Sequence, residues 1–233
     1  MKNIIIASTS TIHGSGYLEY ILPELKLFFK GIDQIIFVPY ARPSGLTYDE
    51  YTSISSKAFA TIGITVKGIH EYDNAKTAIK NAKGIFIGGG NTFELVNQLY
   101  IKNLIPIIKK VVESGTPYFG TSAGSNICGP TMQNTNDMPV VYPPSFDTLG
   151  LINFNINPHY LDPDSNSTHK GETRETRIKE YHIYNNIPVL GIREGSWLHV
   201  INKKITLKGK LKARWFKQGK KPVELDSGFE FNN

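Results

Sequence analysis

Short apolar runs alternate with longer segments of mixed polarity through the first half of this chain. The runs are three to six residues long and rich in Ile, Val and Phe, which is typical of buried β-strands. The segments between them have apolar residues at helical spacing. The expected strands cover residues 3–7, 33–38, 64–69, 84–87 and 117–119, and the expected helices cover 17–30, 47–62, 73–83, 92–100 and 105–113.

Four residues near the starts of these helices support the pattern. Thr47 and Asp73 are of the type that caps a helix N-terminus. Pro106 is tolerated in a first helical turn, and Pro23 is expected in an early turn or at a kink. Alternating strands and helices indicate an α/β fold, with a mostly parallel open sheet and helices on both faces.

Ligands of such sheets bind beside the carboxyl ends of the strands. We therefore expect the loops 8–16, 39–46, 88–92 and 120–126 to meet at one edge. The second half of the chain is richer in loops, at 129–150 and 157–170. A short strand is expected at 154–156, a polar helix at 171–184, and closing strands at 189–192, 197–201 and 204–207. We expect one α/β domain over residues 1–233.

The net charge of +6 comes from one local stretch. Residues 202–221 hold nine Lys and Arg and no acid, and apolar residues alternate with them at Ile205 and Leu207. This pattern favours a half-exposed hairpin over a nucleic-acid-binding patch. The single cysteine, Cys128, excludes an internal disulfide framework, and no signal peptide or apolar run of membrane-spanning length is present. We expect a cytoplasmic protein that binds neither nucleic acid nor membrane.

The candidate chemistry centres on Gly120-Thr121-Ser122-Ala123-Gly124. This is the G-x-S-x-G spacing of a nucleophile elbow, in which a serine lies on a sharp turn between strand and helix. Glycines two residues before and after leave space for that turn. The alternative interpretation is a tight turn with an incidental serine. In the elbow, the N–H of Ala123 faces the same space as the Ser122 hydroxyl.

A second glycine-rich turn, Gly88-Gly89-Gly90, follows the strand at 84–87. The N–H of Gly90 beside that of Ala123 would form a two-donor oxyanion hole. A phosphate cradle is the competing interpretation. It is less favoured because the dinucleotide-binding and Walker patterns are absent.

A serine nucleophile needs a base and an orienting acid. His159 lies in a loop just after a strand and is the favoured base, while His13 and His169 are also in loops and stay open. Asp137 lies between Ser122 and His159 in the chain and is the first candidate acid; Glu194, just after a strand, is the second.

Arg174 and Arg177 lie on the predicted polar helix. They either form ion pairs on a solvated face or supply a guanidinium that binds a substrate carboxylate. The histidines are scattered, with no metal-binding spacing, so we expect neither a metal nor another cofactor.

Several short motifs together resemble the peptidase E group of the S51 serine peptidases, the α-aspartyl dipeptidases. They are GGGNTF at 88–93, GTSAGSN at 120–126, NDMP at 136–139, NPHY at 157–160 and GETRETRI at 171–178. The resemblance implies a fold like that of the class I glutamine amidotransferases, a flavodoxin-like three-layer sandwich, with serine in place of their cysteine. It implies cofactor-free hydrolysis of dipeptides that begin with aspartate.

The resemblance also implies roles for individual residues. Ser122 matches the nucleophile, His159 the base and Asp137 the acid, with Glu194 as a second match. Gly90 and Ala123 match the oxyanion donors, and Arg174 matches the arginine that holds the aspartyl carboxylate. Glu172, beside Arg174, is a candidate for binding the substrate amino group. We expect a monomer or homodimer acting on small acidic dipeptides.

Two alternatives remain at this point. One is a cyanophycinase-like hydrolase of β-aspartyl-arginine polymer, which would need a longer, open groove. The other is a catalytically silent binding module on the amidotransferase-like fold, which would be marked by a broken triad.

Overall fold

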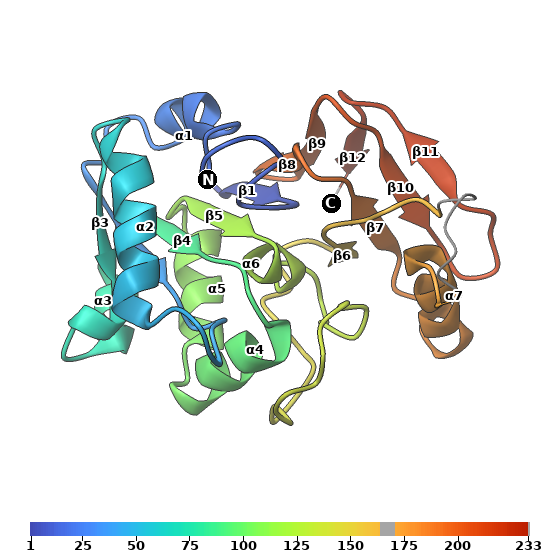
Figure 1. Ribbon diagram of the computed structural model, residues 1–233, viewed down its shortest axis with the longest axis horizontal. Coiled ribbons are helices and arrows are strands. Elements are labelled where there is room, and N and C mark those ends of the chain that lie inside the picture. The colour runs from blue at the N-terminus through green and yellow to red at the C-terminus, as the bar shows by residue number, and fades with distance from the viewer. Residues whose placement is uncertain (164–170, 233) are drawn as a thin grey trace.

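The computed structural model describes residues 1–163 and 171–232, and within them the largest element is an eight-stranded sheet. Its strand order is β12-β9-β8-β1-β5-β4-β2-β3 (Figure 1). The parallel strands are β1 (Asn3–Ala7), β2 (Gln34–Val38), β3 (Thr65–Gly68), β4 (Ile85–Ile87) and β5 (Tyr118–Thr121). The antiparallel strands at one edge are β8 (Ser196–Ile201), β9 (Lys204–Gly209) and β12 (Glu230–Asn232).

Helices cover both faces of the parallel half, as the sequence predicts. They are α1 (Leu22–Phe28), α2 (Tyr48–Ala60), α3 (Ala75–Lys80), α4 (Thr92–Ile101), α5 (Ile105–Glu113) and α6 (Ala123–Asn126), with a 3-10 turn at Ile69–Glu71. None of the helices in the described residues has the length and hydrophobicity to span a bilayer.

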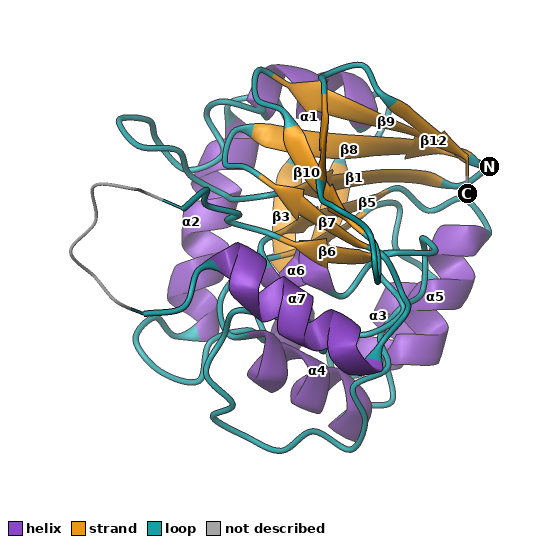
Figure 2. Ribbon diagram, turned by 90° about the vertical axis from the view of Figure 1, so that its right-hand side faces the viewer, coloured by secondary structure: helices purple, strands orange, loops and turns teal. Residues whose placement is uncertain are grey.

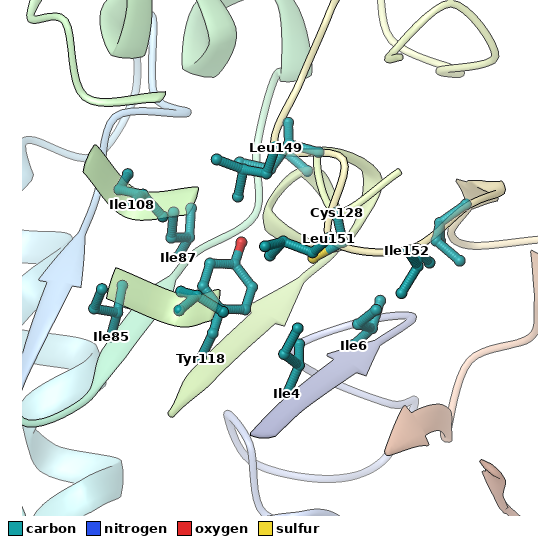
Figure 3. Close-up of a cluster of buried hydrophobic side chains, with 14 of the residues drawn as sticks. Ile4, Ile6, Ile85, Ile87, Ile108, Tyr118, Cys128, Leu149, Leu151 and Ile152 are labelled. Carbon is teal, nitrogen blue, oxygen red and sulfur yellow. The ribbon is translucent and has the colours of Figure 1, made fainter. Parts of the chain in front are cut away.

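Successive residues of the buried strands divide between two cores because side chains alternate across a sheet. Ile5 of β1 and Phe119 of β5 pack with α1 and α2 on one face. Ile4 and Tyr118, their neighbours in the chain, pack on the other face with α3, α4 and α5 (Figure 3). The central strands of the sheet are therefore buried on both sides, and their functional groups must lie at a strand end.

A second sheet of four strands follows the order β11-β10-β7-β6. Its strands are β6 (Asn155–Asn157), β7 (Val189–Ile192), β10 (Ala213–Phe216) and β11 (Val223–Leu225). Helix α7 (Arg174–Tyr184) packs on this sheet through Ile178, which clusters with Val189 and Phe216 (Figure 2).

This second sheet was not predicted from the sequence. The expected closing strand at 189–192 is present, but it pairs with β6 and β10 instead of joining the large sheet. Strands β10, β11 and β12 were missed because they are only three or four residues long and carry charged or exposed residues. Short strands of this kind have no apolar alternation that a sequence pattern can detect.

Several local predictions are confirmed. Thr47 caps α2, since its hydroxyl accepts a hydrogen bond from Glu50 N–H at 3.2 Å. Pro23 and Pro106 both lie in the first turn of their helices. Two predictions are wrong in detail. Asn74 caps α3 in place of Asp73, and the first helix begins at Leu22 because Leu18 has a positive φ of 60°.

The basic stretch forms the outer part of both sheets. Strands β8 and β9 make an antiparallel hairpin that turns at Asn202, and Ile205 and Leu207 of β9 are buried, as predicted. Acidic side chains pair with the cations of the stretch: Lys204 with Glu230, Lys212 with Asp226, and Arg214 with Glu175 and Glu224. Three of the nine cations of the stretch are therefore paired with carboxylates within the fold.

Candidate active site

Ser122 lies at the turn between β5 and α6, at the carboxyl end of the parallel strands. Its backbone has φ 51° and ψ −111°, a conformation that costs a non-glycine residue about 1–3 kcal/mol. The flanking glycines are required by close contacts. A Cβ on Gly124 would lie 2.1 Å from the carbonyl oxygen of Ile87, and one on Gly120 would lie 2.5 Å from that of Gly124. A strained residue on a tight turn between a strand and a helix is the geometry expected of a nucleophile elbow.

His159 is the residue that contacts the Ser122 hydroxyl, with Nε2 2.9 Å from Oγ. It follows β6 and also has a positive φ, of 53°. The backbone N–H of His159 donates to Ser8 Oγ at 2.9 Å, and the Ser8 hydroxyl donates to the carbonyl oxygen of Ile192 at 2.7 Å. Ser8 therefore fixes the backbone of the histidine loop against β7. The sequence analysis missed this residue, although it begins a loop that was expected at the functional edge.

Glu194 completes the chain of contacts, with Oε1 2.6 Å from His159 Nδ1. The topology explains why the two residues meet. Strands β6 and β7 are parallel neighbours with Asn157 opposite Gly191, so His159 and Glu194 both emerge just past the same sheet edge. The negative charge of Glu194, together with the larger effect of burial, raises the pKa of nearby Tyr20.

Asp137, the first candidate acid from the sequence, makes different contacts. Its Oδ2 accepts hydrogen bonds from the N–H of Thr92 at 2.7 Å and the hydroxyl of Thr135 at 3.2 Å. The carboxylate thus lies at the N-terminus of α4, where a negative charge is favourable. Among the described residues, the carboxylate within hydrogen-bond distance of His159 is that of Glu194, the second candidate acid, and not that of Asp137.

The glycine turn 88–90 lies directly against the nucleophile. A Cβ on Gly89 would be 2.8 Å from the Cβ of Ser122, and one on Gly90, whose φ is +140°, would be 2.2 Å from the carbonyl oxygen of Ala41. The N–H of Ala123 belongs to the first turn of α6, where backbone donors have no partner within the helix. The loop that carries Gly90 therefore packs on Ser122 through Gly89, and Ala123 follows Ser122 directly in the chain.

Arg174 is the first residue of α7 and is half-buried. Burial and the neighbouring Arg177 lower its pKa, while the negative charge of Asp137 opposes that effect. Within residues 1–163 and 171–232, no carboxylate forms an ion pair with Arg174. Glu172, the candidate for the substrate amino group, is instead 3.6 Å from Arg177 Nε and largely exposed.

The model of "Peptidase family S51" matches residues 4–208. The chain belongs to this family. The family prediction made from the motifs is confirmed.

Two relatives of the S51 chain are similar over nearly their whole length. This chain is 46% identical to peptidase E of Streptomyces coelicolor over 230 residues, which covers 99% of this chain and 93% of that protein. It is 45% identical over 219 residues to a probable alpha-aspartyl dipeptidase of Drosophila melanogaster, with coverage of 93% and 90%.

Two solved structures share the fold of the S51 chain. A crystal structure of a putative peptidase E protein from Listeria monocytogenes EGD-e has a TM-score of 0.69 at 24% identity. It covers 90% of this chain and 98% of its own. A peptidase from an acI-B1 Actinobacterium has a TM-score of 0.73 at 16% identity and covers 100% of this chain and 97% of its own.

The other candidate histidines of the S51 chain do not contact Ser122 in the part of the chain that the structure describes. His13 is exposed in its loop, and His169 lies outside the described residues. His70 pairs with Asp49 at 2.8 Å, and His199 lies 3.1 Å from Asn3 Oδ1.

Cys128 is fully buried, and burial raises the pKa of its thiol to about 12. A neutral thiol inside a core is a poor nucleophile, so Cys128 is not a candidate for that role. The described residues hold no group of three or more His, Cys, Asp or Glu side chains placed to bind a metal ion.

Proposed function

We propose that this S51 chain is a serine-type dipeptidase that hydrolyses dipeptides with an N-terminal aspartate. The observation that carries the proposal is the continuous contact from Ser122 through His159 to Glu194, at 2.9 Å and 2.6 Å. Its relatives named peptidase E and probable alpha-aspartyl dipeptidase support the choice of substrate.

In the acylation step, His159 Nε2 takes the proton of Ser122 as Oγ attacks the carbonyl carbon of the Asp–Xaa bond. Glu194 holds the imidazole in the tautomer with its proton on Nδ1 and stabilises the imidazolium that forms. The N–H groups of Gly90 and Ala123 donate to the oxyanion of the tetrahedral intermediate. The C–N bond then breaks, and His159 gives its proton to the leaving amine.

In the deacylation step, a water molecule loses a proton to the same Nε2 and attacks the aspartyl ester of Ser122. Collapse of the second tetrahedral intermediate breaks the ester bond, and the proton returns from His159 to Ser122 Oγ. Free aspartate is released, and no metal or organic cofactor takes part in either step.

Arg174 selects the substrate by binding the aspartyl β-carboxylate. Its half-buried guanidinium has no carboxylate partner in the described residues, so an acidic side chain supplies one. A substrate without that carboxylate leaves the cation partly desolvated and unpaired, which costs several kcal/mol, or on the order of a thousandfold in rate. Asp137, whose charge acts on Arg174, helps to hold it in place.

The proposal includes the layout of the class I glutamine amidotransferases for the parallel half of the chain, with Ser122 at the position of their cysteine. The elbow after β5 and the glycine turn after β4 support it, because neighbouring parallel strands deliver a nucleophile and an oxyanion loop to one edge.

The test supplies Asp-Leu and Ala-Leu to the wild-type protein, to Ser122→Ala and to Arg174→Gln. We expect cleavage of Asp-Leu by the wild type, with Ala-Leu slower by about a thousandfold. Ser122→Ala should be inactive, and Arg174→Gln should lose most of the preference for aspartate. Equal rates on the two peptides would refute the substrate, and full activity of Ser122→Ala would refute the mechanism. Release of β-Asp-Arg from polymer would instead indicate the cyanophycinase-like activity.

A further inference from the structure

The five arginines of the chain fall into two groups. Arg177, Arg193 and Arg214 each form ion pairs with carboxylates. Arg42 and Arg174 form none with any residue in the described ranges 1–163 and 171–232. Arg174 already has a role in the proposed function. Arg42, the second of these two arginines, has no role in the proposed function.

A series of backbone contacts connects Arg42 to the nucleophile. Arg42 follows Ala41 in the loop after β2, and the Ala41 carbonyl oxygen accepts a hydrogen bond from Asn91 N–H at 2.8 Å. The same oxygen packs on Gly90, and the adjacent Gly89 packs on Ser122. The loop that carries Arg42 is therefore built against the predicted oxyanion loop.

The side chain of Arg42 is held over an aromatic ring that also contacts this loop. Its guanidinium carbon lies 4.5 Å from the centre of the Tyr51 ring, and the Tyr51 hydroxyl donates to the carbonyl oxygen of Gly89 at 3.2 Å. Stacking on an aromatic face positions a guanidinium without neutralising its charge.

The immediate surroundings of Arg42 supply no counter-charge. Its Nε is buried and has no hydrogen-bond acceptor among the described residues. Tyr17 is close enough for the charge of Arg42 to act on it, but burial and Tyr51 raise the pKa of Tyr17 well above its usual range, so that phenol is neutral at pH 7. A buried donor without an acceptor is costly and points to an acceptor supplied from outside.

The two arginines approach the elbow from opposite faces of the large sheet. Tyr51, under Arg42, belongs to the core that α1 and α2 cover. Arg174 interacts with Asp137, which binds the start of α4, and α4 covers the other face. In Figure 1, α2 and α7 lie on opposite sides of β5 and α6. A substrate held at Ser122 would thus have one free cation on each side.

From this arrangement we infer that Arg42 binds the C-terminal carboxylate of the dipeptide, on the leaving-group side of the scissile bond. The inference rests on the proposed function, which places the aspartyl side chain at Arg174. An Asp-Xaa dipeptide has two carboxylates, one on each side of the bond that breaks, and so matches a site with two separated guanidiniums. A second cation of this kind selects dipeptides over longer peptides, whose terminal carboxylate lies further from Ser122.

The test compares Asp-Leu with aspartyl-leucinamide, in which an uncharged amide replaces the C-terminal carboxylate. For Arg42→Gln, we expect kcat/KM on Asp-Leu to fall by about 10- to 100-fold, the usual effect of a charge-assisted hydrogen bond. The same variant should change kcat/KM on aspartyl-leucinamide by less than about threefold, because the lost interaction has no partner there. Arg42→Lys keeps the charge without the planar guanidinium. Its kcat/KM on Asp-Leu should lie between the values of the wild type and Arg42→Gln.

Lys57→Gln is the matched control, because it removes one positive charge from an exposed position on the same helix as Tyr51. It should leave both substrates unaffected. An equal loss on the two substrates in Arg42→Gln would overturn the inference and assign Arg42 a structural role. Unchanged kinetics in Arg42→Gln would also overturn it. If the wild type cleaves neither substrate, the proposed function itself fails, and this outcome is distinct from a failure of Arg42 alone.

Discussion

Glu194 Oε1 lies 2.6 Å from His159 Nδ1, although the two residues are 35 positions apart in the chain. The contact exists because β6 and β7 are parallel neighbours, and each residue follows the end of its strand. It supports Glu194 as the acid proposed to orient the imidazole, while Asp137 binds the start of α4 and its charge acts on Arg174.

Replacing Glu194 by Gln should lower kcat on Asp-Leu by about 100- to 10,000-fold, because the amide does not hold the imidazole tautomer or stabilise its protonated form. The melting temperature should change by less than about 2 °C, since both side chains are partly exposed and the pair contributes little to folding. Steady-state kinetics and calorimetry measure the two effects. Asp33→Asn, which removes an exposed carboxylate paired with Lys83, serves as the control. Full activity of Glu194→Gln would contradict this role.

Replacing Asp137 by Ala should destabilise the fold, because the first N–H of α4 loses its charged acceptor. We expect a loss of about 1 kcal/mol, which lowers the melting temperature of a chain of this size by about 2–4 °C. Asp137→Asn retains an oxygen acceptor without the charge and should lose about half as much. A melting temperature unchanged in both variants would show that the contact with Thr92 carries no stability.

Ser122→Gly should be inactive but more stable than the wild type. Glycine adopts the observed φ of 51° and ψ of −111° without the steric cost that a Cβ imposes. We expect a gain of about 1 kcal/mol in the free energy of unfolding, measured by denaturant titration. Ser122→Ala keeps the Cβ and should match the stability of the wild type. Equal stability of the two variants would mean that the elbow stores no strain.

Gly90→Ala should lose both stability and activity, because the new Cβ would lie 2.2 Å from the carbonyl oxygen of Ala41. Moving that backbone should cost about 2–4 kcal/mol and displace an oxyanion donor, with a fall in kcat of about 100-fold. Gly45 provides the control. It also has a positive φ, +82°, but no atom lies within 4 Å of its ideal Cβ, so Gly45→Ala should cost only about 1–2 kcal/mol and leave kcat unchanged. Similar costs at both positions would refute the contact argument.

Stability should fall in mild acid partly because of His199. Burial lowers its pKa, an effect that Glu24 opposes and Lys208 reinforces. The unfolded chain therefore binds a proton more readily than the folded one. The contribution is fully present above the unfolded-state pKa of about 6.5 and is lost as the pH falls from there through the lower folded-state pKa. Urea unfolding at pH 7.5 and 5.5 should show a smaller pH dependence in His199→Gln than in the wild type. The same dependence in both proteins would contradict the assignment.

The parallel half of the fold could be predicted from the sequence because most of its strands are short apolar runs that are buried on both faces. The second sheet could not, because β10 and β11 are only three or four residues long and carry charged or exposed residues. Strand β12, at the edge of the large sheet, is as short. Arg42 was also missed. Its loop was expected at the functional edge, but a single arginine in a loop has no pattern to distinguish it.

The sequence by itself determined the G-x-S-x-G turn, the family and the positions of Ser122 and His159 at strand ends, because local glycines and strand boundaries encode them. Only the tertiary structure decided between Asp137 and Glu194, since both follow Ser122 in polar segments and their distance from His159 depends on strand pairing. The same is true of the two arginines that have no carboxylate partner among residues 1–163 and 171–232. Whether a cation is paired depends on which acids the fold brings near it, and that information is not local in the chain.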